Sequence, residues 1–177
     1  ALVEIGGYDP TLIAGEEPEL CLRLRRAGWK IERLDADMTL HDAAIHSWRQ
    51  WWKRTRRSGF AFASGSALHG GGPERHWVHE TRRVVLWGAV LPAVAVGGSV
   101  PTLGLSLGLL SAYPLSFVRV FRSMRRRGRA PRDAALYAAF TQLGRFPEVQ
   151  GVLQFHRDRW LGKASEIIEY KSAGKQK

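Results

Sequence analysis

The feature that most constrains this chain is an uncharged run from Val84 to Val118, where no Asp, Glu, Lys, Arg or His occurs over 35 residues. A cluster of turn-forming residues, GGSVP at 97–101, interrupts the run near its middle. Residues 84–100 and 102–118 each number 17 and as helices would extend about 25 Å, close to the roughly 30 Å of a bilayer's hydrocarbon core. The run therefore predicts a transmembrane helical hairpin at 84–118, with a buried helix pair in a soluble core as the alternative.

Basic residues crowd both ends of this run. Arg82 and Arg83 precede it, a set of arginines follows it, and the whole chain carries a formal net charge of +11. Such a charge suits anionic lipid, phosphorylated substrates or nucleic acid, but flanking arginines are typical of the cytoplasmic ends of membrane helices. We therefore expect a protein of the inner (plasma) membrane that faces the cytoplasm. We expect no nucleic-acid partner, because the arginines lie beside an apolar run instead of in a recognised binding module.

The remaining composition divides the chain into further regions. Residues 46–83 contain a helical candidate, 46–68, in which three tryptophans alternate with arginine and lysine, followed by a GGGP loop at 70–73. This composition is typical of a helix at a membrane interface. Residues 119–177 predict a basic, amphipathic cytoplasmic tail with a helix at 131–146, which Pro147 would end.

Residues 1–45 read as part of an α/β layer. A turn at 6–10 would follow a strand at 2–5, a helix would run from about Pro18 to Ala27, and a second strand would occupy 29–34. Pro18 suits the first helical position, which makes Glu17 the expected N-cap. Glu19 precedes Arg23 by four residues, a spacing that favours an ion pair. Cys21 falls where such a helix buries a side chain, and we interpret it as a core thiol.

The ordered pattern GGYD at 6–9, GEEPELCLRLRRAGWKI at 15–31 and His41 resembles the second half of the family 2 inverting glycosyltransferases. The match covers roughly residues 3–60 and implies the GT-A fold. The expected fold class is thus an α/β fragment, the C-terminal part of a Rossmann-like GT-A domain, followed by a mainly α-helical membrane hairpin and amphipathic C-terminal helices.

The resemblance also implies roles by position. Glu17, the second member of the acidic pair, would be the general base that deprotonates the acceptor hydroxyl, and Glu16 would orient the acceptor or neighbouring groups. Members of the family usually have Asp where this chain has Glu17, so Glu16 or Glu19 remains an alternative base. Glu19 is a candidate substrate-binding residue. Arg54 and Arg57 are further candidates, because their guanidinium groups suit diphosphate oxygens. An interfacial anchor is the competing interpretation of the arginines.

His41 resembles the histidine that holds a divalent metal or the leaving diphosphate in many GT-A enzymes. The implied cofactor is Mg²⁺ or Mn²⁺, bound mainly by a segment before Ala1 that would carry the nucleotide-binding strands and the DxD motif. Asp35 and Asp37 spell DxD but follow the acidic pair instead of preceding it. We therefore interpret them as a turn or strand end.

These expectations combine into one functional hypothesis. The chain, which begins ALVEIGGYDP without Met or a signal peptide, would be a fragment of a membrane-associated glycosyltransferase and inactive alone. Its partners would be a nucleotide-sugar donor, a lipid-linked or polysaccharide acceptor, and the membrane. The alternative is a non-enzymatic basic membrane adaptor that binds anionic lipids through its arginines.

Overall fold

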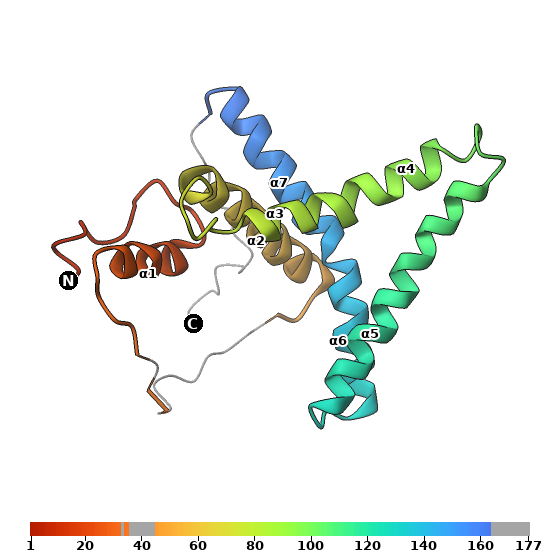
Figure 1. The fold of residues 1–177 in the computed structure, drawn as a ribbon, viewed down its shortest axis with the longest axis horizontal. Helices are drawn as coiled ribbons and strands as arrows, with labels where there is room; N and C mark the ends of the chain where they lie inside the picture. Colours follow the sequence, from red (N-terminus) through yellow and green to blue (C-terminus); the bar gives the residue numbers. More distant parts are fainter. Residues whose placement is uncertain (33, 36–44, 164–177) are drawn as a thin grey trace, which may run out of the picture.

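The computed structural model describes residues 1–32, 34, 35 and 45–163 of the chain. Within these ranges the regular structure is helical throughout (Figure 1). The elements in chain order are α1 (Glu16–Arg26), α2 (Trp48–His69), α3 (Val78–Val85), the π-helix η1 (Leu86–Val90), α4 (Leu91–Gly97), the 3-10 helix η2 (Leu105–Ser111), α5 (Ala112–Arg126), α6 (Pro131–Leu143) and α7 (Arg145–Trp160).

The predicted α/β layer is wrong, because no strand occurs in the described part of the chain. Residues 2–5 form a turn instead, with the Gly6 amide donating to the Val3 carbonyl and the Gly7 amide to the Leu2 carbonyl. The described residues of the second expected strand, 29–32 and 34, have no regular structure. A strand is stable only when a neighbouring strand satisfies its backbone groups. Here the amides of Ile5, Gly6 and Gly7 are satisfied within the turn itself, and the carbonyls of Ile5 and Gly7 accept from a side chain of α1.

Helices α2 and α7 cross at the centre of the molecule and hold the core. Gly59 and Gly151 lie where the two backbones meet, so closely that a Cβ on Gly151 would lie 2.0 Å from the Arg56 carbonyl oxygen. Around the crossing, the apolar core is built from Ala63, Val84, Val149 and Val152, with Phe60 also fully buried. Small residues at the crossing thus let α2 and α7 pack backbone to backbone. This contact fixes the positions of the elements connected to the two helices.

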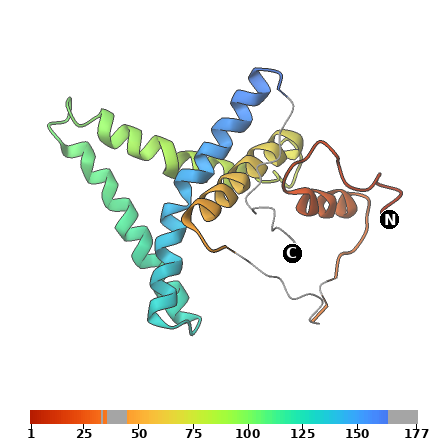
Figure 2. The same cartoon turned by 180° about the vertical axis from the view of Figure 1, so that it is seen from behind.

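The rest of the chain forms an open, three-sided frame of helices (Figures 1 and 2). One side is α3, η1 and α4, the second is η2 and α5, and the third is α6 continued by α7. Two sides meet at a tip at residues 97–105, which lies at the opposite end of the molecule from α1. The Tyr113 hydroxyl donates to the Trp87 carbonyl and so braces the two arms of the frame.

The predicted transmembrane hairpin is also wrong: in the described ranges, no helix has both the length and the apolar character needed to cross a membrane. The uncharged run is instead divided among several short elements. Its first half ends with the seven residues of α4, and its second half begins with seven residues of 3-10 helix. A tight turn at 98–104 separates these halves.

The tail also differs from its prediction at one boundary. The expected helix from Pro131 is α6, but it ends at Leu143, and Pro147 lies in the first turn of α7. Proline is tolerated there because the first amides of a helix have no intrahelical acceptor. Pro147, which was expected to end a helix, therefore lies in the first turn of the next one.

Candidate functional site

The acidic cluster GEEPEL stands at the start of α1, which begins two residues earlier than predicted. Gly15 is the N-cap residue, with φ 83° and ψ 19° and no side-chain capping bond. A Cβ at this position would lie 2.5 Å from the Trp77 ring. Glycine is thus required twice, for its left-handed backbone and for the close approach of the indole.

Glu16 and Glu17 occupy the first two positions of α1, with Glu16 half-buried and Glu17 exposed. No hydrogen bond or ion pair reaches either carboxylate from the residues that the structure describes. The backbone amides at a helix N-terminus and the helix dipole favour negative charge there. The start of α1 therefore carries two carboxylates, of which Glu17 is open to solvent and Glu16 is partly so.

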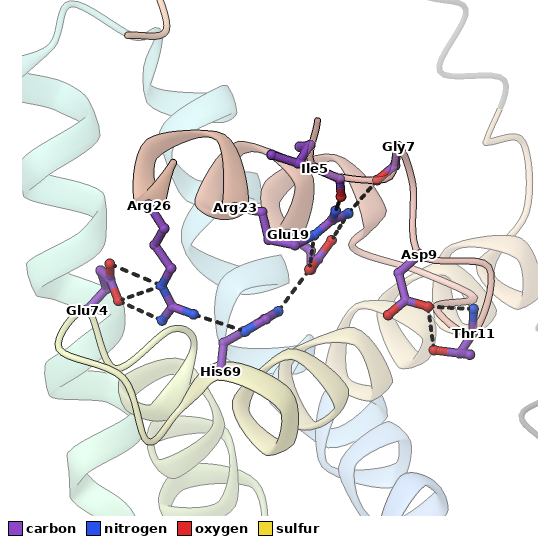
Figure 3. A network of polar contacts seen from close by, with 9 residues as sticks. All are labelled: Ile5, Gly7, Asp9, Thr11, Glu19, Arg23, Arg26, His69 and Glu74. Carbon is purple, nitrogen blue, oxygen red and sulfur yellow. Dashed lines mark hydrogen bonds and ion pairs between the residues drawn. The ribbon is translucent and has the colours of Figure 1, made fainter. Parts of the chain in front are cut away.

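Glu19, two residues further on, has a different environment, shown in Figure 3. Its side chain is only 2% exposed and lies between two partners. Arg23 donates from Nε to Glu19 Oε1 at 2.7 Å and from Nη2 to Oε2 at 2.8 Å. His69, at the end of α2, approaches Oε1 with its Nε2 at 2.8 Å. The ion pair expected from the spacing of Glu19 and Arg23 is confirmed.

Charge and hydrogen bonding fix the state of this buried carboxylate. Burial alone would raise the pKa of Glu19, but the hydrogen bonds from Arg23 and His69 outweigh it and hold that pKa below its ordinary value. Arg26 Nη1 lies 3.2 Å from His69 Nδ1, and a guanidinium can only donate. Nδ1 is therefore the acceptor, which leaves Nε2 to donate its proton to Glu19.

Arg23 also connects the N-terminal turn to α1. Arg23 Nη1 donates to the Ile5 carbonyl, and Nη2 donates to the Gly7 carbonyl at 2.6 Å. Beyond this turn, the amide and hydroxyl of Thr11 both donate to Asp9 Oδ1 (Figure 3), and these bonds lower the pKa of Asp9. The segment that leads into the acidic cluster is thus held by Arg23.

The predicted substrate-binding arginines lie on α2. Arg57 is half-buried and donates from Nη2 to the Ile13 carbonyl at 2.6 Å, two residues before Gly15. Arg54 is exposed and lies one helical turn earlier on the same face. The structure therefore brings Arg57 to the loop that leads into α1, just before Glu16 and Glu17. His41, the predicted metal ligand, lies outside the described residues, as does Asp37.

Three residues of this site had no sequence prediction: His69, Glu74 and Trp77. Arg26 Nη2 donates to Glu74 Oε2 at 2.7 Å, and this hydrogen bond lowers the pKa of Glu74 to about 2. Trp77 has a left-handed backbone, φ 53°, and its ring packs between α1 and α2 against Gly15 and Gly65. No local pattern marks the contacts of these residues with α1 and its N-cap, because the partners lie 48 to 62 positions apart in the sequence.

The tryptophans of α2 pack against α6 and α7, with Trp51 and Trp52 half-buried and Trp48 still 52% exposed. Trp48, Trp51 and Phe140 of α6 form a ring cluster with centroids 4.6–6.1 Å apart, and the Trp52 indole donates to Gln150 of α7 at 3.0 Å. These rings join α2 to the third side of the frame. Their packing explains why an aromatic-rich, basic helix has a structural role in this fold.

Within the described ranges, no cluster of three or more His, Cys, Asp or Glu side chains is arranged to hold a metal ion. Comparisons of the chain with protein-family profiles, with curated proteins and with solved structures found no match.

Proposed function

We propose that this chain supplies the acceptor-activating carboxylates of an inverting glycosyltransferase that resembles family 2. Glu17 is the general base: it takes the proton from an acceptor hydroxyl as the oxygen attacks the anomeric carbon of a nucleotide-sugar, and the nucleotide diphosphate leaves. A lipid-linked or polysaccharide hydroxyl is the acceptor.

The observation that carries the proposal is that the three glutamates of the GEEPEL cluster differ in burial and in hydrogen-bond partners. Glu19 is buried and bonded to Arg23 and His69, whereas at the start of α1 Glu17 is exposed and Glu16 half-buried. A general base must reach its substrate and remain ionised. The Glu17 carboxylate is exposed and can meet a substrate, and the Glu19 contacts hold the helix that carries it in place.

The neighbouring groups have complementary roles in this proposal. Glu16 orients the acceptor beside Glu17, and Arg57, held at the Ile13 carbonyl, contributes positive charge near the leaving diphosphate with Arg54 beyond it. Glu19 acts through α1 by fixing its orientation. A divalent metal and the nucleotide-binding segment complete the site from residues outside those described.

The test is metal-dependent sugar transfer by the full-length protein that contains this chain. Glu17→Gln should lower kcat by about 10²–10⁴-fold, the usual contribution of a general base, with a smaller change in KM. Glu16→Gln should have a smaller effect on kcat. Glu32→Gln, an exposed glutamate beyond α1, is the matched control and should behave as wild type.

Two results would overturn the assignment. Wild-type kcat in Glu17→Gln with loss of activity in Glu16→Gln would transfer the role of base to Glu16. Unchanged activity in both variants, or no sugar transfer by the full-length protein, would remove the enzymatic proposal and favour a non-enzymatic adaptor.

A further inference from the structure

The tip of the helical frame exposes large apolar side chains in an unusual concentration. Val100 is 84% exposed, Leu103 95% and Leu105 84%, and further exposed valines and leucines continue down both arms. They are Val90, Val94, Val96, Leu107, Leu109 and Leu115. A water-soluble surface scatters such residues singly, whereas a contiguous set marks an interaction surface.

The hydroxyl groups of the tip are hydrogen-bonded to carbonyl groups of the tip and of α4. The hydroxyls of Ser99, Thr102 and Ser106 donate to backbone carbonyls of the tip and of α4, at 2.6–2.7 Å. The Gly104 amide closes the turn on the Ser99 carbonyl at 2.7 Å. A turn that enters an apolar medium must satisfy its own hydrogen-bonding groups in this way.

Positive charge begins where the apolar surface ends. Arg82 and Arg83 are exposed at the base of the first arm. Along α5, the exposed apolar residues Leu115 and Val118 give way to exposed arginines, which are Arg119, Arg122, Arg125, Arg126 and the C-cap residue Arg127. An apolar end with arginines behind it is complementary to a bilayer, whose hydrocarbon lies behind anionic headgroups.

We propose that the tip and the adjoining turns of both arms, residues 94–109, insert into one leaflet of an anionic membrane, with the nearest arginines of α3 and α5 contacting the headgroups. The seven residues of η2 extend about 14 Å at the ~2.0 Å rise of a 3-10 helix, which matches one leaflet of roughly 15 Å. The attachment is shallow and requires no spanning helix. It does not depend on the sugar-transfer proposal.

Binding of the chain to lipid vesicles tests this surface. The chain should float with vesicles of phosphatidylcholine containing about one third phosphatidylglycerol, and less with phosphatidylcholine alone. The double variant Leu103→Asp, Leu105→Asp should lower binding to both by more than about 100-fold, because each leucine loses its burial in hydrocarbon. Leu153→Asp changes a leucine of α7 that is 59% exposed and should leave binding unchanged.

The arginines have a separate signature. Replacing Arg82, Arg83 and Arg119, the first exposed arginines beyond the apolar surface, by Gln should weaken binding to the anionic vesicles by about 100-fold, at about fivefold for each charge. It should change binding to phosphatidylcholine little. Raised salt should reduce the wild-type advantage of anionic vesicles and have a smaller effect on this triple variant.

The outcomes separate the membrane from other occupants of the tip. Vesicle binding that survives the Leu103 and Leu105 substitutions would overturn the proposal, as would equal losses in Leu153→Asp. Tip-dependent dimers in analytical ultracentrifugation that persist when vesicles are added would assign the surface to a second copy of the chain. Circular dichroism checks that the variants are folded, which their exposed positions favour.

Discussion

The crossing of α2 and α7 makes a sharp prediction for Gly151→Ala. The added Cβ would lie 2.0 Å from the Arg56 carbonyl oxygen and 2.6 Å from the Phe60 amide nitrogen, both backbone atoms that no side-chain rotation can move. Restoring even a 3.0 Å contact requires the two helices to separate by about 1 Å, and overpacking of this kind costs about 1–3 kcal/mol or more. Alanine returns up to about 1 kcal/mol of helix propensity.

Because the clash involves rigid backbone, we place the cost at the upper end of that range. The net loss in the free energy of unfolding is then about 2 kcal/mol. For a chain of this size, each kcal/mol changes Tm by about 2–4 °C, so Gly151→Ala should lower Tm by about 4–8 °C. Thermal and urea unfolding, followed by far-ultraviolet circular dichroism, measure both quantities.

A matched glycine separates the clash from helix propensity. Gly97 ends α4, and a Cβ there would meet nothing within 4 Å, so Gly97→Ala should be neutral or stabilising by up to about 1 kcal/mol. Gly59→Ala, whose Cβ would lie 1.9 Å from the Glu148 carbonyl oxygen, should be destabilised like Gly151→Ala. A Gly151→Ala variant as stable as Gly97→Ala would refute the backbone-to-backbone crossing.

Two further predictions concern the acidic site. Glu19→Gln should lower the free energy of unfolding by about 2–3 kcal/mol at neutral pH, because it leaves Arg23 without its buried anion. The pKa of Glu19 is lowered in the folded state, so its contribution is present above the ordinary glutamate pKa and is lost as pH falls through the folded value. Urea unfolding across acid pH should thus show a shallower loss in Glu19→Gln, and parallel curves would contradict the ion pair. Gly15→Ala should destabilise more than Gly28→Ala: both have left-handed backbones, φ 83° and 85°, but only Gly15 meets the Trp77 ring. Equal losses would remove the indole contact from the argument.

Sequence reasoning succeeded where the interaction is local. The spacing of Glu19 and Arg23 within one helix was enough to predict their ion pair, because residues four apart lie on one helix face. The helix itself was predicted to within two residues at its start, with Pro18 in its first turn. The glycines at 6 and 7 were expected to form a turn, and both have positive φ.

Sequence reasoning failed where the outcome depended on what surrounds a segment. Alternating residues at 29–34 predicted a strand, yet the described residues there have no strand to pair with. The uncharged run predicted spanning helices, but the structure divides it among the end of α3, η1, α4, a tight turn, η2 and the start of α5. Hydrophobicity alone does not distinguish these arrangements.

The sequence by itself determined the local chemistry: an acid-rich helix start, an arginine-rich helix end and a long apolar run bounded by arginines. Only the tertiary structure decided that Glu19 is enclosed by His69 from fifty residues away, while Glu16 and Glu17 are left available. It also decided that the apolar run projects as an exposed tip. The physical reason is that charge and hydropathy belong to each residue, whereas burial and hydrogen-bond partners belong to the packing of distant segments.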